Sequence, residues 1–294
     1  MALLRSIATL GSFTMISRVM GLAREILLAN VVGPGLILDA FIFAFKFPNF
    51  FRRMFAEGAF NAAFVPLFAG RLQEEGQEAA RRYAGEVVAV MTTWMLFLTM
   101  LAMAAMPWIM IVLALGWTDQ PEKFDLTVTL TRITFPYLMF MVLMAMLSGM
   151  LNSMGRFAVT AAAPILLNVS LIAALLLVHY GVVEAAGHAL AWAVAIAGIA
   201  QFLWLVLACR RMAILPRMPW PKLTPGVRRL FTLMLPGVIG ASVVHINLLI
   251  DMILATLLPE GSLSFLFLAD RINQFPLGVV GVSVCLLYTS PSPR

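Results

Sequence analysis

The sequence has 294 residues, of which 62% are hydrophobic and only 12% are charged. Because about a quarter of the residues in a soluble domain are charged, this composition excludes an ordinary soluble protein. The formal net charge of +6 would suggest a nucleic-acid partner in a soluble protein, whereas in a membrane protein it can arise from basic loops.

Eight hydrophobic spans follow one another along the chain. Runs without charge, such as Val87–Thr118 and Phe157–Val183, exceed the ~20 residues that a helix needs to cross a bilayer. Lipid offers the backbone no hydrogen-bond partner, so such spans are helical. We expect them at residues 7–32, 38–68, 85–115, 127–152, 158–180, 185–210, 227–257 and from 263 onward. The predicted fold class is all-α, a polytopic helical membrane protein.

The loops between these spans alternate in charge. Eleven Lys and Arg residues fall at the N-terminus and in the even-numbered loops, against one, Lys123, in the others. The positive-inside rule therefore predicts a cytoplasmic N-terminus and cytoplasmic basic loops. Since the basic residues mark orientation, no nucleic-acid partner is expected.

The longest basic loop, Cys209–Arg229, is rich in Pro and Arg and is predicted to separate two lobes. "ILLANVVGPG" (26–35) resembles "MILATLLPEG" (252–261); a parallel repeat of this kind is typical of transporters, although chance similarity between apolar segments is an alternative. The predicted parts are a six-helix lobe (1–210), a cytoplasmic basic linker (211–229), the first two helices of a second lobe (230–282) and an atypical tail (283–294). We expect the chain to be the first part of something longer.

Charged side chains lie within the spans, where each costs about 2.5–3.5 kcal/mol at a helix centre. They should therefore face the bundle interior or a water-filled cavity. The excess of arginine predicts an anionic ligand with a phosphate head, because the planar guanidinium fork fits phosphate oxygens. These residues are Arg18, Arg24, Glu25, Asp39, Lys46, Arg52, Arg53, Glu57, Arg132, Asp251, Asp270 and Arg271.

Simpler interpretations stay open for some of these charges. Arg132 is expected to reach toward the membrane interface. Glu25 and Glu57 fit a counter-ion role equally well, and Asp270–Arg271 fits a local pair. The sequence has no nucleophile with a paired base, no metal-ligand spacing and no Gly-rich nucleotide loop, so we expect no enzyme.

"SRVMGLARE" (17–25) and "KFPNFFRRMFAEGAF" (46–60) belong to a segment, Ser17–Phe68, that resembles the N-terminal signature of the MurJ/MviN family. Segments Phe135–Asn168 and Leu268–Val282 resemble it too. The members of this family are lipid II flippases of bacterial peptidoglycan synthesis, within the MOP exporter superfamily. The resemblance implies a fourteen-helix transporter of the bacterial inner membrane. Such a transporter moves undecaprenyl-pyrophosphate-linked lipid II to the periplasmic leaflet by alternating access, with cell-wall synthesis machinery as a further partner.

The resemblance also implies residue roles. Arg18, Arg24, Arg52 and Arg271 match cavity arginines that would contact the pyrophosphate and sugar. Asp39, Lys46, Arg53 and Glu57 would gate the cavity or balance its charge. Asp251 would correspond to a sodium ligand; no organic cofactor is implied, and coupling to sodium or to the membrane potential is expected.

Two alternatives to a lipid II flippase remain open at this stage. One is another exporter of the same superfamily, either a multidrug antiporter or a polyprenyl-linked oligosaccharide flippase. An antiporter for cationic drugs should have an acidic cavity, whereas this one is predicted to be basic. The other is a membrane scaffold that transports nothing, whose helices should lack convergent charges.

Overall fold

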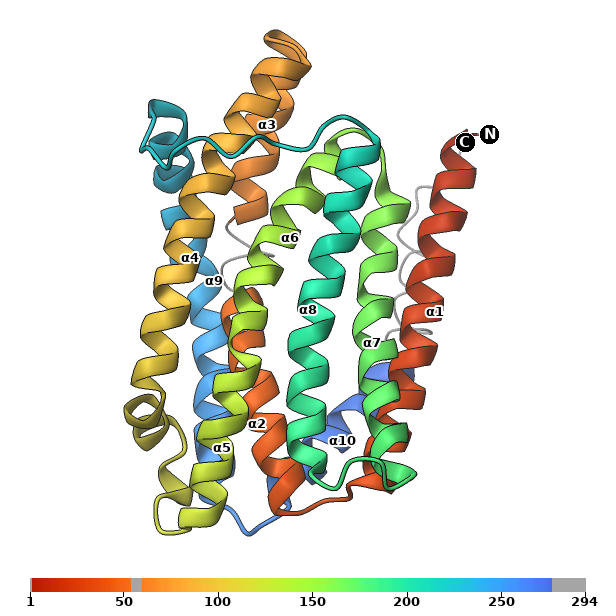
Figure 1. Cartoon of the computed structure of the whole chain (residues 1–294), viewed down its shortest axis with the longest axis vertical. Coiled ribbons are helices and arrows are strands. Elements are labelled where there is room, and N and C mark those ends of the chain that lie inside the picture. The colour runs from red at the N-terminus through yellow and green to blue at the C-terminus, as the bar shows by residue number, and fades with distance from the viewer. Residues whose placement is uncertain (1, 54–59, 277–294) are drawn as a thin grey trace, which may run out of the picture.

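The computed structural model describes residues 2–53 and 60–276, and within them it contains helices and no strand. The prediction of an all-α fold is confirmed. Most of the helices run along the long axis of a single bundle (Figure 1). They are α1 (Ala2–Val31), α2 (Leu36–Phe51), α3 (Asn61–Glu74), α4 (Gln77–Leu113), α5 (Pro121–Thr134), α6 (Pro136–Ser153), α7 (Phe157–His179), α8 (Ala186–Arg211), α9 (Pro225–Thr256) and α10 (Ser262–Pro276).

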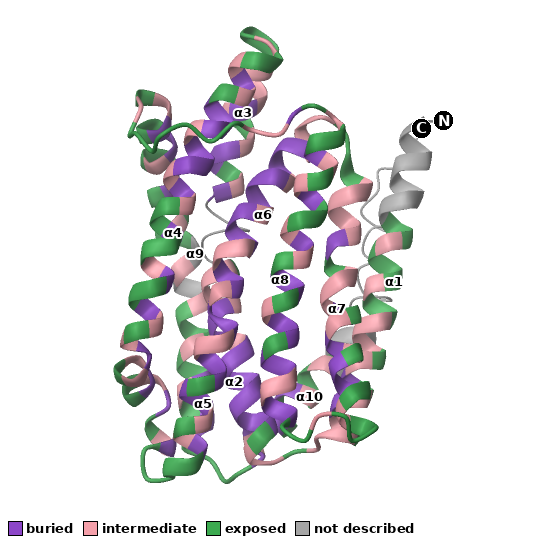
Figure 2. Ribbon diagram, in the orientation of Figure 1, coloured by how far each residue is buried: buried purple, intermediate pink, exposed green. Residues whose placement is uncertain are grey.

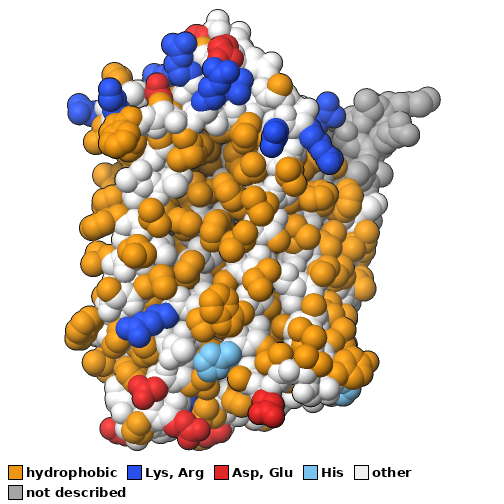
Figure 3. Space-filling model, viewed as in Figure 1, with side chains coloured by type: hydrophobic (Ala, Val, Ile, Leu, Met, Phe, Trp, Pro, Cys, Tyr) orange, Lys and Arg blue, Asp and Glu red, His pale blue; other side chains and the backbone are white. Residues whose placement is uncertain are grey.

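The outer surface of the bundle is apolar along most of its length (Figure 3). On α4, for example, Trp94, Phe97, Met100 and Trp108 are all more than half exposed, and Figure 2 shows exposed residues along much of this helix. Within the described residues, four segments are long and apolar enough to cross a membrane: α4, α5 with α6, α7 and α8. The two arms of α9, bent by 52°, make a fifth. The chain is a multi-pass membrane protein.

Two of the predicted spans each contain two helices. The span predicted at 127–152 is divided between α5 and α6 at Pro136, whose ring nitrogen cannot donate to the carbonyl of Arg132. The span predicted at 38–68 contains most of α2 and the start of α3. Residues 54–59, which include the predicted site residue Glu57, lie outside the described residues.

Helix packing brings distant parts of the chain together. α1 packs on α7 and α7 on α8, while α2 lies against α5 and α8. α10 contacts both α1 and α2, so it reaches the two helices with the most predicted site residues. The buried core between these helices is rich in aromatic side chains, including Phe41, Phe43 and Phe47 of α2.

The connection from α8 to α9 is shorter than the predicted linker 211–229. Only residues 212–224 are non-helical, because α9 begins at Pro225. This connection lies directly against α4, where a Cβ atom on Gly85 would come within 2.1 Å of the carbonyl oxygen of Arg217. The predicted tail 283–294 lies outside the described residues.

Candidate functional site

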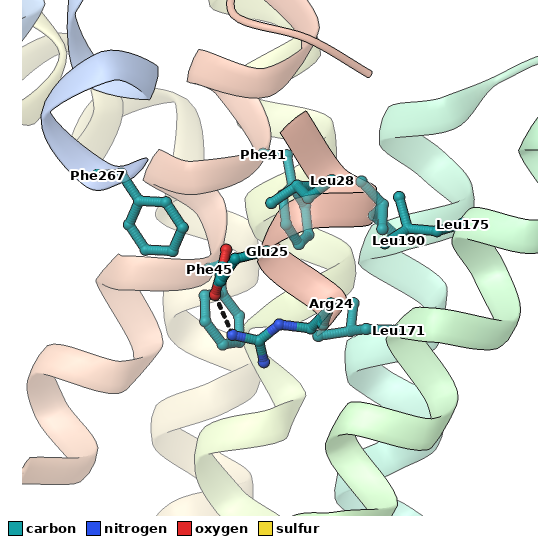
Figure 4. A pocket seen from close by; sticks show the side chains of 9 residues that line it. All are labelled: Arg24, Glu25, Leu28, Phe41, Phe45, Leu171, Leu175, Leu190 and Phe267. Atoms are coloured by element: carbon teal, nitrogen blue, oxygen red, sulfur yellow. Dashed lines mark hydrogen bonds and ion pairs between the residues drawn. The ribbon is translucent and has the colours of Figure 1, made fainter. Parts of the chain in front are cut away.

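Charged side chains from α1 and α10 meet inside the bundle. Glu25 is buried and forms an ion pair with its neighbour Arg24. Arg271 of α10 places its Nε 3.9 Å from the same carboxylate oxygen of Glu25. Arg24 and Glu25 border a small cavity of about 10 Å³ whose other lining side chains are apolar (Figure 4). Two arginines from different helices therefore share one buried carboxylate.

Arg24 also forms a hydrogen bond with Asn168, a residue that the pattern of charges in the sequence does not predict to be part of the site. Its Nη1 donates to Oδ1 of Asn168 on α7 over 3.0 Å, and Nδ2 of Asn168 donates to the carbonyl oxygen of Ser17 over 2.9 Å. Because a guanidinium only donates and a carbonyl only accepts, these two contacts fix the orientation of the amide. The only sequence signal for this role is an amide side chain within a long apolar run.

Lys46 and Arg271 contact the same aromatic ring. The Nζ of Lys46 lies 5.4 Å from the centroid of the Phe267 ring, and the guanidinium carbon of Arg271 lies 5.1 Å from it. Lys46 also interacts electrostatically with Asp270, Asp251 and Arg53. In this region, which we call the cationic cluster, four basic side chains outnumber the three acidic ones. Its members are Arg24, Lys46, Arg53, Arg271, Glu25, Asp251 and Asp270.

Arg52 occupies the C-terminal end of α2, where its half-buried side chain is held by Asn49. The Nε of Arg52 donates to Oδ1 of Asn49 over 2.9 Å. The Nδ2 of Asn49 in turn donates to the carbonyl oxygen of Phe45 over 2.8 Å. The direction of Arg52 therefore depends on the path of the α2 backbone one turn earlier.

Three of the predicted site residues lie at exposed positions. They are Arg18 on α1, which is not a member of the cationic cluster, and the cluster members Arg53 and Asp251. Within the described residues, no three His, Cys, Asp or Glu side chains group closely enough to hold a metal ion. The sodium role of Asp251 stays a prediction.

Asp39 lies near the other end of α2, fully buried and away from the cationic cluster. Its Oδ2 accepts from the Nζ of Lys123 on α5 and from the backbone N–H of Gly261, both over 2.8 Å. Its Oδ1 accepts from the N–H and the hydroxyl of Ser264 over 2.9 Å and 2.6 Å. Asp39 thus caps the N-terminus of α10 from another helix, where a negative charge is favourable.

Lys123 differs from its expected place. The sequence pattern assigns it to an exposed loop, but its side chain is only 1% exposed and lies 4.3 Å from the Trp117 ring. The ion pair with Asp39 therefore joins α2 and α5 to the first turn of α10 inside the protein.

The two turns with similar sequence also meet at this end of the bundle. The N–H of Leu36 donates to Glu260 over 2.9 Å, and a Cβ atom on Gly261 would lie 3.7 Å from the nitrogen of Gly35. Gly261 has a positive φ of 86°, which favours glycine. The sequence similarity between these turns therefore coincides with a direct contact.

Comparisons with known proteins agree with this architecture. A family model described as "Lipid II flippase MurJ" matches residues 28–288. A probable lipid II flippase MurJ of Rhizobium tropici is 45% identical over 97% of this chain and 54% of its own length. The lipid II flippase MurJ of Burkholderia cenocepacia is 37% identical over 97% of this chain and 56% of its own length. The chain thus spans about half the length of the curated relatives it matches.

Two solved transporter structures have a fold similar to that of this chain. A lipid II flippase MurJ in an inward closed conformation superposes with a TM-score of 0.76 at 26% identity, covering 95% of this chain and 57% of the other. An inward-facing multidrug resistance MATE family transporter of the MOP superfamily superposes with a TM-score of 0.64 at 16% identity, over 92% of this chain and 62% of the other. The second likeness extends to the fold alone.

Proposed function

This chain belongs to the MurJ family of lipid II flippases, and on that premise we propose that it supplies one half of a flippase for lipid II. The observation that carries the proposal is the cationic cluster, in which Arg24 and Arg271 share the buried carboxylate of Glu25. A pyrophosphate can replace this carboxylate as the acceptor, because arginine binds phosphate oxygens through the same donors. The protein acts in this proposal as a transporter and catalyses no reaction.

We propose the following residue roles. Arg18, Arg24, Arg52 and Arg271 contact the pyrophosphate and sugar of the substrate, while Lys46, Arg53 and Glu57 balance charge along its path. Asp39 has a gating role in this proposal, since its carboxylate joins α2 to Lys123 of α5 and to the start of α10. A cationic drug is disfavoured as the substrate, since basic side chains predominate in the cluster.

A chimaera tests the proposal. Residues 1–276 of this chain replace the matching part of the Rhizobium tropici relative, and the chimaera is expressed while the host flippase is depleted. We expect it to restore export of labelled lipid II to the level of the unaltered relative. A chimaera that inserts at the normal level and exports no lipid II would contradict the proposal.

We further propose that the protein lies in the bacterial inner membrane with its N-terminus in the cytoplasm. Lys and Arg gather at the end of the bundle that carries the N-terminus and the 212–224 connection, and Asp and Glu predominate at the other end (Figure 3). Basic residues near membrane spans remain on the cytoplasmic side.

Single-cysteine labelling checks this orientation. With Cys209 and Cys285 replaced by serine, a cysteine in place of Glu75 should react with a membrane-impermeant maleimide only after the cells are opened. A cysteine in place of the exposed Asp119 should react in intact cells and serves as the control. Labelling of position 75 from outside would reverse the orientation.

A further inference from the structure

A proline within α2 leaves one backbone carbonyl without its helical partner. Pro48 has no N–H, so the carbonyl of Ala44 cannot accept the usual bond from four residues later. Ala44 is completely buried, and an unsatisfied polar group in the membrane interior is costly. Another group has to supply the donor.

Thr134, the last residue of α5, supplies it. Its hydroxyl lies 2.7 Å from the carbonyl oxygen of Ala44 and 3.2 Å from that of Thr131 in its own helix. The Thr134 side chain is fully buried, and the carbonyl of Thr131 also accepts the N–H of Phe135 over 2.8 Å. The shorter contact, to Ala44, is therefore the one that fills an empty position.

A second side chain in the last turn of α5 also donates to a carbonyl that a proline leaves without its helical partner. Pro107 frees the carbonyl of Met103 in α4, and the Nε of Arg132 donates to that oxygen over 3.0 Å. Arg132, expected to reach the membrane interface, instead bonds the backbone of a neighbouring helix. Two polar side chains at the end of α5 thus satisfy two carbonyls freed by prolines in two different helices.

Pro48 directly precedes the residues that hold Arg52. Asn49, which accepts from Arg52, follows Pro48 in the sequence, and the backbone N–H of Arg52 donates to the carbonyl of Pro48. We propose that Thr134 is a positioning residue for Arg52: by satisfying the Ala44 carbonyl, it fixes the path of the α2 backbone at Pro48 and thereby aims Arg52 at the substrate. The effect of Thr134 on the α2 backbone is independent of the proposed function, whereas the contact of Arg52 with the substrate rests on it.

A labelling experiment on this chain tests the geometric part. With Cys209 and Cys285 replaced by serine, Arg52→Cys reports the exposure of position 52 through its rate of reaction with a maleimide. Thr134→Val keeps the shape but removes the hydroxyl, and we expect it to change this rate at least threefold. Thr134→Ser, which restores the donor, should return the original rate.

Two controls separate this effect from general loosening. The Thr131 hydroxyl donates only to its own helix, over 2.7 Å to Thr127, so Thr131→Val should leave the rate unchanged. In a Pro48→Ala background the new N–H satisfies Ala44, so Thr134→Val should have no further effect. An unchanged rate in Thr134→Val, or an equal change in both backgrounds, would overturn the proposal.

The transport assay then tests the functional part. In the chimaera, Thr134→Val should lower lipid II export roughly tenfold, as expected when a buried acceptor loses its donor, while Thr134→Ser and Thr131→Val retain export. If the labelling rate changes and export does not, the effect of Thr134 on the α2 backbone is confirmed and the role of Arg52 in transport is wrong. The two failures are therefore distinguishable.

Discussion

Replacing Arg24 by alanine in the chimaera should reduce lipid II export by about 10–100-fold, because a hydrogen bond to a charged group contributes about 1.5–3 kcal/mol. The replacement removes a donor to the substrate and leaves Glu25 buried with one arginine instead of two. Arg24→Lys should recover little export, since a lysine ammonium cannot form the bidentate contact of a guanidinium. The measurement is export of labelled lipid II at matched protein levels.

The control for this prediction is Arg156→Ala, which removes the same charge from an exposed position between α6 and α7. It should leave export unchanged. Arg18→Ala and Arg52→Ala are expected to act in the same direction as Arg24→Ala. Full export in all three alanine variants would refute the phosphate path.

Replacing Asp39 by alanine should lower the free energy of unfolding by about 3–5 kcal/mol, the usual effect of removing one partner from a buried ion pair. Lys123 would remain buried without its counter-charge, and the backbone N–H groups of Gly261 and Ser264 would lose their acceptor. The measurement is thermal or denaturant unfolding of the purified chain in detergent.

Two further variants define the cause of this loss. Asp119→Ala, at an exposed position of the loop before α5, should have little effect. Adding Lys123→Met to Asp39→Ala should restore part of the stability, because the uncompensated charge is gone. An Asp39→Ala protein that unfolds like the original would show that the ion pair and the cap contribute nothing.

The sequence predicts the all-helical fold well because the feature that indicates it, a long apolar run without charge, is local in the sequence. A run such as Val87–Thr118 has no charge, and a run of that length has one stable structure in lipid. The breaks are harder to predict. Pro136 divides a predicted span, whereas α4 continues through Pro107 and α7 through Pro164, so a proline by itself does not mark the end of a helix.

The site is predictable where a charge lies in apolar surroundings and not where the partner is neutral or distant. Arg24 and Arg271 are conspicuous for their charge, and the structure places both at one carboxylate. Asn168 and Thr134 carry no charge, and their roles arise only when α7 and α5 pack against other helices. Lys123 reads as a loop residue, since nothing near it in the sequence reveals its bond to Asp39.

The order in which the chain is synthesised has a consequence for the cap on α10. Synthesis proceeds from the N-terminus, so α2 and α5 enter the membrane before α10 leaves the ribosome. During that interval the Asp39 carboxylate cannot accept hydrogen bonds from the N–H groups of α10, and Lys123 alone neutralises its charge. The ion pair therefore compensates the Asp39 charge early, and α10 packs against a carboxylate that is already in place. Asp39 of α2 is therefore synthesised before the residues at the start of α10 whose N–H groups it accepts.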